Sequence, residues 1–309
     1  MKKTEFCYKS RDGITNIHAI EWLPDGEVKG VLQICHGMVE YIDRYDEFAA
    51  YMTERGFCVV GHDHLGHGKS IQSEDDFGYF PHKNGNKYVI GDIHRLREGT
   101  RKRYPDVPYF MLGHSMGSFL LRQYLMKYGS GLSGAVIMGT GYQPLSVLVA
   151  GQILCRLIAI PKGWKYRSEL VNNMSFGAFN KKFEPSETPK DWVCSDKEKL
   201  TEYINDPLCS FVFTIGGYYQ MFEGMKKLAR KSAVKKIPKD LPILFVSGKD
   251  DPVGNFGRSV NRVYRDYKAC GIKDVSIKLY VGDRHEILNE TDRKQVYKDL
   301  YRWIRKRMS

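Results

Sequence analysis

The residues best suited to covalent chemistry lie at 113–117 and read G-H-S-M-G. Ser115 stands between two glycines where a predicted strand, PYFML (108–112), meets a predicted helix. A sharp turn at such a junction projects the serine hydroxyl from the end of the sheet. The helix that follows offers free backbone N–H groups, which stabilise developing negative charge. This setting favours Ser115 as a nucleophile for acyl transfer over a chance match on a glycine-rich turn.

A serine hydroxyl is a weak nucleophile near neutral pH and needs a general base that an acid orients. After a strand–turn–helix of this type, the acid and then the base follow the serine along the chain, each behind a late strand. The strand-like LPILFVSG (241–248) precedes Asp250 and Asp251, and VSIKLYVG (275–282) precedes His285. Each residue alone could cap a turn or lie on the surface. Their joint placement predicts a Ser-Asp-His triad with the acid at Asp250 or Asp251.

An oxyanion hole needs two backbone N–H donors beside the nucleophile. The first is expected from Met116, the residue after the serine, and the second from the loop after the predicted strand VLQIC (31–35). That loop reads His36-Gly37-Met38. We expect the Met38 N–H to be the second donor.

A second polar run, GHDHLGHGKS (61–70), has three interpretations. A zinc site of the H-x-H-x-D-H type needs an acid where Gly66 stands, and a phosphate-binding P-loop needs glycine where Asp63 stands. The third interpretation is a turn in which Gly66 and Gly68 supply backbone freedom and Asp63 accepts local hydrogen bonds. We expect this loop to brace the oxyanion segment and to bind no metal.

The elements that must position these residues follow an alternating order. Short apolar runs that end near glycine alternate with helical patterns, which is typical of a parallel sheet with crossover helices. Segments around 4–10 and 14–23 read as an antiparallel pair at one edge, so we predict an α/β fold with eight mostly parallel strands. The other predicted strands cover 31–37, 57–63, 108–115, 133–141, 241–248 and 275–282, and helices are predicted at 45–56, about 88–103 and from Ser115 onward.

The alternation fails between residues 143 and 235, which are rich in aromatic residues. We expect a helical cap here, inserted after the sixth strand, over a core formed by 1–142 and 236–309. Its most apolar stretch (145–160) is interrupted by Gln152 and Arg156, and we predict that it is too short and too polar for a membrane span. The alternatives are a buried lid helix and a helix whose outer face touches lipid.

The chain has 48 Lys and Arg against 36 Asp and Glu, a net charge of +12, which favours anionic partners. The basic stretches 225–239 and 302–309 are either solvated helix faces or contacts with anionic lipid. No nucleic-acid-binding module accompanies the charge, so no nucleic-acid partner is expected.

The seven cysteines are scattered, without a C-x-x-C pair, and several lie in apolar runs. This pattern predicts buried free thiols and a cytoplasmic setting, with a pool at the inner membrane surface as the alternative. The first residues, MKKTEFCYKS, lack the apolar segment of a secretory signal.

These motifs together resemble the monoacylglycerol lipase and lysophospholipase-like group of the α/β-hydrolases, also classed as serine aminopeptidase-like hydrolases. The similarity extends over nearly the whole chain and rests on HGMVE, RYDEFA, DHLGHGKS, GHSMG, DPLCSF, GKDDPV and RHEILNE. It implies the α/β-hydrolase fold, with Ser115 as nucleophile, Asp251 rather than Asp250 as acid, and His285 as base.

The same resemblance implies Met38 and Met116 as the oxyanion donors and places Gly37, His114 and Tyr41 beside the substrate. Val39 and Tyr41 stand at places that vary within the group's oxyanion loop.

The leading hypothesis is therefore a serine carboxylester hydrolase that acts on lipid-like esters, monoacylglycerols or lysophospholipids, without cofactor or metal. The same triad cleaves amides and thioesters, so a peptidase, an amidase and a thioesterase are alternatives. A non-catalytic lipid-binding homologue is a further alternative, which a broken triad would favour; here no triad residue is missing.

Overall fold

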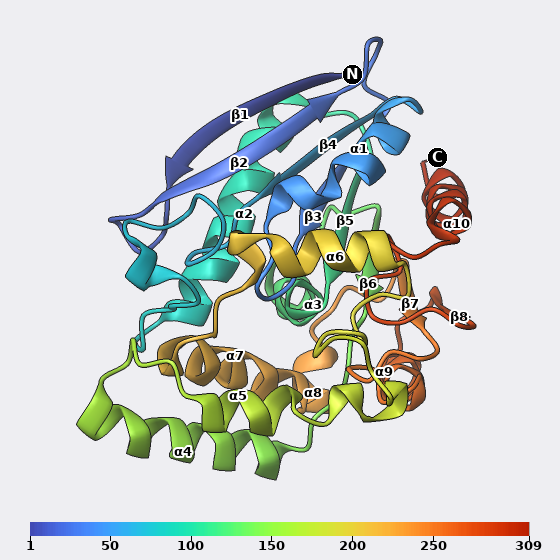
Figure 1. Ribbon diagram of the computed structural model, residues 1–309. Coiled ribbons are helices and arrows are strands. Elements are labelled where there is room, and N and C mark those ends of the chain that lie inside the picture. Colours follow the sequence, from blue (N-terminus) through green and yellow to red (C-terminus); the bar gives the residue numbers. More distant parts are fainter. Residues whose placement is uncertain (309) are drawn as a thin grey trace.

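The computed structural model describes residues 1–308 and is built on an eight-stranded sheet of order β1-β2-β4-β3-β5-β6-β7-β8 (Figure 1). The edge strand β1 pairs antiparallel with β2, β2 pairs antiparallel with β4, and the other neighbours are parallel. This confirms the predicted fold class. The strands are β1 (Lys2–Lys9), β2 (Asn16–Leu23), β3 (Gly30–Cys35), β4 (Phe57–His62), β5 (Tyr109–His114), β6 (Gly134–Met138), β7 (Ile243–Gly248) and β8 (Val275–Tyr280).

Helices cover both faces of the sheet because successive strand residues point to opposite sides. In β3, Leu32 and Ile34 pack with α1 (Asp46–Thr53) and α10 (Arg293–Arg305). Val31 and Cys35 face the other layer, which consists of α2 (Gly85–Arg103), α3 (Met116–Tyr128) and α9 (Arg258–Ala269).

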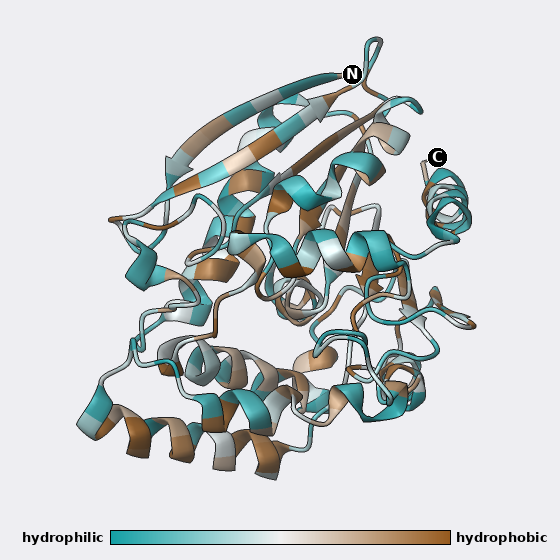
Figure 2. Cartoon of the chain, in the orientation of Figure 1, coloured by the Kyte–Doolittle hydropathy of each residue, from teal (hydrophilic) through white to brown (hydrophobic). Residues whose placement is uncertain are grey.

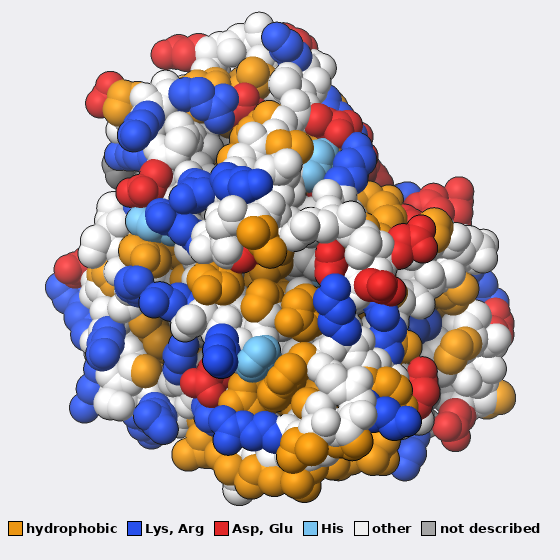
Figure 3. All heavy atoms as spheres, turned by 90° about the vertical axis from the view of Figure 1, so that its left-hand side faces the viewer, with side chains coloured by type: hydrophobic (Ala, Val, Ile, Leu, Met, Phe, Trp, Pro, Cys, Tyr) orange, Lys and Arg blue, Asp and Glu red, His pale blue; other side chains and the backbone are white. Residues whose placement is uncertain are grey.

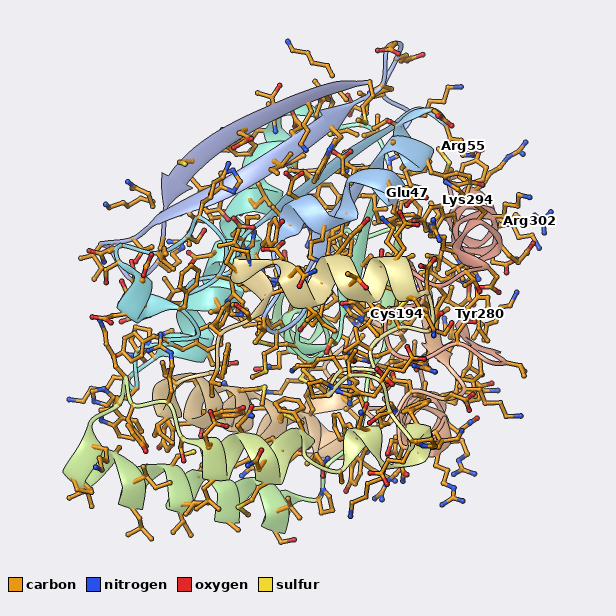
Figure 4. All side chains as sticks on the ribbon, in the orientation of Figure 1. Glu47, Arg55, Cys194, Tyr280, Lys294 and Arg302 are labelled. Atoms are coloured by element: carbon orange, nitrogen blue, oxygen red, sulfur yellow. The ribbon has the colours of Figure 1, made fainter. Side chains whose placement is uncertain are left out.

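An ion pair joins the two helices of the first layer. The carboxylate of Glu47 on α1 lies 2.8 Å from Lys294 Nζ on α10 (Figure 4). Single-turn 3-10 helices, η1 (Ile42–Tyr45) and η2 (Glu74–Asp76), precede α1 and α2.

Between β6 and β7 the chain forms a layer of helices below the sheet (Figure 1). In this layer α7 packs on both α4 and α3, and the buried Ile215 and Tyr218 of α7 belong to the same hydrophobic cluster as the sheet. The layer therefore shares its core with the sheet. The elements between β6 and β7 are α4 (Leu145–Lys162), α5 (Glu169–Phe176), η3 (Phe179–Phe183), α6 (Lys197–Asn205), η4 (Pro207–Cys209), α7 (Ile215–Leu228) and α8 (Lys231–Val234). Of these, α6 lies above the other helices in Figure 1, in front of the strands.

Several large apolar side chains of α4 are exposed, and Figure 2 shows much of this helix in the hydrophobic colour. Leu157 and Ile160 are 60% and 82% exposed, whereas Gln152 is buried. Gln152 Nε2 donates to the backbone oxygen of Tyr219 on α7 at 3.1 Å, and Arg156 Nε donates to the Tyr219 hydroxyl at 3.1 Å. The hydrogen bonds of Gln152 and Arg156 with Tyr219 thus orient α4 so that its apolar side chains are exposed to solvent.

By length and composition α4 could cross a membrane, because its 18 residues have a mean hydropathy of 1.6; 22% of that window is buried. The prediction that this stretch is too short and too polar for a span was wrong on both criteria. The helix continues beyond residue 160, through Pro161 to Lys162, and so is longer than the apolar run.

The cysteines are free thiols, as predicted, and all except Cys7 are buried.

Candidate active site

Ser115 occupies the strained turn between β5 and α3. Its backbone has φ 51° and ψ −119°, a conformation that residues with side chains rarely adopt. The Ser115 N–H donates to the Met138 carbonyl on β6 at 3.0 Å, which holds the turn to the sheet. A Cβ on Gly117 would lie 2.0 Å from the Cys35 carbonyl oxygen, so only glycine lets α3 start this close to β3.

His285 and Asp251 complete a chain of three polar groups. His285 Nε2 lies 2.8 Å from Ser115 Oγ, and His285 Nδ1 lies 3.0 Å from Asp251 Oδ2, although the ring N–H is not well aligned with that oxygen. Asp251 is fully buried and accepts hydrogen bonds from Ser247 Oγ at 3.0 Å and the Val253 N–H at 2.8 Å. In this geometry an acid orients a base that reaches the serine hydroxyl.

Asp250, the other acidic residue of the loop after β7, points elsewhere. Its carboxylate pairs with Lys182 of η3, and its side chain is 32% exposed. The structure therefore brings Asp251, and not Asp250, to the histidine.

The loop after β3 lies against the serine. A Cβ on Gly37 would be 3.0 Å from Ser115 Cβ, and Val39 turns the loop with φ 57°. Met38 and Met116 line the same cavity as Ser115. Within residues 1–308 neither of their backbone N–H groups donates a hydrogen bond, so both are free to bind a carbonyl oxygen that acquires charge.

A buried polar network behind the serine was not foreseen from the sequence. Glu40 Oε1 accepts hydrogen bonds from the Gly37 N–H, from His114 Nδ1 at 2.9 Å and from the Tyr45 hydroxyl at 3.1 Å. Arg44 lies 3.2 Å from Glu40 Oε2. The only signal available was position, since Glu40 follows the H-G of the oxyanion loop.

Arg44 extends this network to the histidine loop. Its two terminal nitrogens donate to the two oxygens of Glu286, both at 2.8 Å, and Glu286 follows His285 in the chain. Burial by itself would raise the pKa of the Glu286 carboxyl, but the Arg44 guanidinium holds it below its usual range. The oxyanion loop and the histidine loop are thus joined by charged groups that contact each other out of water.

The pKa values of Glu40 and His114 shift in opposite directions. Burial by itself would raise the pKa of Glu40, but the hydrogen bond with His114 and the nearby Arg44 hold it well below the usual range. Burial would lower the pKa of His114, yet the hydrogen bond with Glu40 and its charge raise it overall. Both shifts favour an ionised pair.

The loop at 61–70 lies beside the oxyanion segment. Asp63 is fully buried and accepts hydrogen bonds from the backbone N–H groups of Ile42 and Lys69, at 2.8 and 2.9 Å. The His64 N–H donates to His36 Nε2 at 2.8 Å, which connects this loop to the first residue after β3. Within residues 1–308 no cluster of three or more His, Cys, Asp or Glu could hold a metal ion.

Two of the expected substrate contacts lie outside the cavity wall. Tyr41 instead donates its hydroxyl to Asp206 Oδ2 at 2.8 Å, which links the oxyanion loop to η4. Gly37 lies behind Met38, where its N–H binds Glu40. His114, the third expected contact, does line the cavity.

A cavity of about 1300 Å³ opens above Ser115 and runs beneath α4, α5 and α7. Aromatic side chains predicted for the cap form much of its wall, whereas Phe183, Tyr218 and Tyr219 pack elsewhere. The aromatic wall residues from this part of the chain are Phe176, Phe179, Trp192, Tyr203, Phe211, Phe213 and Phe222.

Comparison with known families gives one match over most of the chain. Residues 26–292 match the model of the family described as serine aminopeptidase, S33.

Individual relatives are similar over their full lengths. A monoglyceride lipase homolog of Monkeypox virus is 28% identical over 93% of this chain and 94% of its own length. A monoacylglycerol lipase of Mycolicibacterium smegmatis is 27% identical over 98% of this chain and 97% of its own. Among solved structures, a thermostable carboxyl esterase from Bacillus coagulans in complex with glycerol superposes with a TM-score of 0.92 at 30% identity, covering 100% of both chains.

Proposed function

Because this chain belongs to the serine aminopeptidase S33 family of α/β-hydrolases and is a carboxylester hydrolase, we propose that it cleaves monoacylglycerol- or lysophospholipid-like esters through an acyl-enzyme on Ser115. The observation that carries the proposal is the contact chain from Ser115 Oγ to His285 Nε2 (2.8 Å) and from His285 Nδ1 to Asp251 Oδ2 (3.0 Å) at the floor of a large apolar cavity.

In the first half-reaction, Ser115 Oγ attacks the ester carbonyl carbon while His285 Nε2 takes the hydroxyl proton. The backbone N–H groups of Met38 and Met116 bind the oxyanion that forms. The bond to the leaving oxygen then breaks, and His285 returns the proton to the alcohol.

In the second half-reaction, water attacks the acyl-enzyme. His285 takes a proton from the water, the carbonyl–Oγ bond breaks, and Ser115 regains its proton as the carboxylic acid leaves. Asp251 keeps the imidazole oriented and stabilises its charged form throughout.

The acyl chain lies under the cap, for which we propose the bounds 143–235. Phe119, Phe213 and Leu148 are buried and line the cavity, so a hydrocarbon chain there contacts apolar walls. Each buried CH₂ group contributes about 0.8 kcal/mol relative to water. This contribution favours long-chain esters over small polar ones.

Substitution of Ser115 tests whether this residue is the nucleophile. Wild-type protein is expected to hydrolyse p-nitrophenyl butyrate and to be labelled on Ser115 by a fluorophosphonate. The Ser115→Ala variant is expected to lose both, while Ser118→Ala, one turn along α3, keeps both. Full activity of the Ser115→Ala variant would contradict the proposed nucleophile.

Contact with a lipid surface is the second part of the proposal. Apolar side chains gather along the lower edge of Figure 3, over α4, with lysines and arginines on the surface nearby. On α5, Leu170 and Met174 are also 56% and 70% exposed. An apolar face surrounded by basic residues suits an anionic bilayer or a substrate aggregate.

Vesicle co-sedimentation tests this contact. Wild-type protein is expected to bind phosphatidylglycerol vesicles more strongly than phosphatidylcholine vesicles. A Leu157→Ser/Ile160→Ser double variant is expected to lose most binding while it keeps p-nitrophenyl butyrate hydrolysis. Equal binding of wild type to both vesicles would remove the electrostatic part of the proposal, and undiminished binding of the variant would remove α4 as the contact.

A further inference from the structure

Unpaired cations line the cavity that contains Ser115. Lys190 and three arginines of α9, Arg258, Arg262 and Arg265, belong to its wall. In the part of the chain that the structure describes, none of the four forms an ion pair or donates a side-chain hydrogen bond. The chain has an excess of basic residues, so unpaired cations are expected on its surface. Four of them around one catalytic cavity form a local positive field.

The carboxylates of the wall do not balance this charge. Glu40 and Glu286 are the acidic residues of the cavity lining, and each is already paired. Glu40 binds His114 and Arg44, and Glu286 binds both terminal nitrogens of Arg44. The four cations therefore have no counter-charge in the cavity wall.

Lys190 lines the cavity and precedes a segment that contacts the loop of His285, the residue that protonates the leaving alcohol in the proposed mechanism. The Glu286 N–H donates to the Val193 carbonyl at 2.8 Å, and the Trp192 ring centroid is 5.3 Å from that of His285. The segment that begins at Lys190 is thus fastened to the histidine loop. Lys190 is partly buried, and this burial lowers the pKa of its ammonium group, with no anion present to offset the lost hydration.

The three arginines share one face of α9 because their spacing is i, i+4 and i+7. The Arg262 guanidinium carbon lies 3.6 Å from the ring centroid of Tyr142, which also lines the cavity. A planar guanidinium donates two parallel hydrogen bonds to a phosphate, and a cluster of them attracts a doubly charged group.

We propose that the preferred substrate is an acyl ester whose alcohol part carries a phosphate group, in place of an uncharged monoacylglycerol. This inference rests on the proposed function and narrows it. The acyl chain fills the apolar part of the cavity, the ester lies at Ser115, and the phosphorylated alcohol leaves past His285 beside Lys190. The arginines of α9 bind or attract the phosphate at the cavity mouth.

Two esters with the same acyl chain test the substrate class. The measurement is kcat/KM for 1-octanoylglycerol and 1-octanoylglycerol 3-phosphate, both below their aggregation limits. Wild-type protein is expected to favour the phosphate ester at least tenfold, and added salt is expected to reduce that preference.

Substitutions of the four cations test which residues cause the preference for the phosphate ester. Lys190→Gln and the triple variant Arg258→Gln/Arg262→Gln/Arg265→Gln are each expected to lose about tenfold in kcat/KM for the phosphate ester and to keep the value for the neutral ester. Lys190→Arg is expected to retain the preference. The matched control is Lys181→Gln, an exposed lysine on η3 outside the cavity lining, with both values unchanged.

Equal kcat/KM for the two esters, or an equal loss of both in Lys190→Gln, would overturn the inference. Inhibition by inorganic phosphate without any preference between the esters would also overturn it, because that result assigns a site for free phosphate. These outcomes are separate from failure of the proposed function, which would appear as absent p-nitrophenyl butyrate hydrolysis and absent fluorophosphonate labelling in wild-type protein.

Discussion

Glu40 and His114 form a buried pair beside Ser115, with 2.9 Å between Glu40 Oε1 and His114 Nδ1 and only 4% of each side chain exposed. Because the same carboxylate oxygen accepts the Gly37 N–H, this pair connects the oxyanion loop to the residue before Ser115. The position of the loop that carries Met38, next to Ser115, therefore depends on a buried charged pair.

Glu40→Gln is expected to lower kcat for p-nitrophenyl butyrate by about ten- to a hundredfold, with little change in KM. Removal of one charge from a buried pair leaves the other uncompensated, which typically costs about 3–5 kcal/mol in folding stability. The oxyanion donor also loses its support, which weakens transition-state binding more than substrate binding. The control is Glu54→Gln, whose carboxylate is on the surface at the end of α1.

NMR titration of the same variant distinguishes a positioning role from a packing defect. The hydrogen bond with Glu40 raises the pKa of His114 against the effect of burial, so its loss is expected to lower that pKa. An unchanged His114 titration together with unchanged kcat would show that the pair does not support the site.

The two adjacent aspartates are expected to differ sharply in their effect on turnover. Asp251→Asn is expected to reduce kcat by about 10⁴-fold, because an amide does not stabilise the charged imidazole in the required tautomer. Asp250→Asn is expected to keep kcat within about twofold, since its partner is Lys182 at the surface. Steady-state kinetics on p-nitrophenyl butyrate measure both, and a larger loss in Asp250→Asn would reassign the acid.

Acid is expected to destabilise the protein through the histidines of the 61–70 loop. Burial lowers the pKa values of His62 and His67 from 6.5 to about 3, so both stay neutral in the fold over a range where the unfolded chain protonates them. His62 Nδ1 and His67 Nε2 have no hydrogen-bond partner within residues 1–308. Because the unfolded state binds more protons, this stability is complete above pH 6.5 and is lost as the pH falls toward 3.

The size of the expected acid destabilisation follows from the pKa shifts of His62 and His67. At pH 5 each histidine is expected to remove about 2 kcal/mol from the free energy of unfolding. Urea denaturation at pH 7 and pH 5 measures the total for wild-type protein. His67→Phe keeps an aromatic ring among Phe80, Phe211 and Phe213 and removes one protonation site. The decrease in its free energy of unfolding between pH 7 and pH 5 is therefore expected to be about 2 kcal/mol smaller than that of wild-type protein. An identical loss in both proteins would contradict this account.

Two glycine substitutions are expected to shift stability in opposite directions. Gly117→Ala places a methyl group 2.0 Å from the Cys35 carbonyl oxygen, and the forced separation of α3 from β3 is expected to cost about 3 kcal/mol or more. Gly99→Ala, within α2, meets no atom within 4 Å and is expected to stabilise by about 0.5–1 kcal/mol. Thermal unfolding measures both, and a neutral Gly117→Ala would show that the helix start tolerates displacement.

The fold could be predicted from the sequence, and so could the placement of Ser115 and His285 after strands, because both depend on local signals in a fixed order. Ser115 and His285 follow apolar strands, and strand ends of a parallel sheet meet at one edge. The predicted ends of helices and strands were less accurate than their predicted order. The helix predicted at 45–56 begins after a 3-10 turn at Ile42–Tyr45 and ends at Thr53, because Gly56 with φ 86° belongs to the turn that follows.

The network around Glu40 was not predictable in this way. Glu40, Arg44, His114 and Glu286 come from separated segments, and their pairing depends on how those segments pack. The choice between Asp250 and Asp251 likewise needed a resemblance, since both follow the same strand and no periodicity separates them. The orientation of α4 was also open, because it depends on tertiary contacts such as the hydrogen bond from Gln152 to the backbone oxygen of Tyr219.

The helix α4 alone separates this part of the cavity from the exterior of the protein. Leu148 and Leu154 line the cavity, Leu157 and Ile160 face outward, and Val147 both lines the cavity and is 54% exposed. An acyl chain that enters beside Val147 from a bilayer would exchange one hydrocarbon environment for another, so its CH₂ groups would contribute little net free energy. The same chain arriving from water would gain about 0.8 kcal/mol per CH₂ group. Discrimination by chain length would then be strong for dissolved monomers and weak at an interface, where the rate would follow the mole fraction of substrate in the surface and not its bulk concentration.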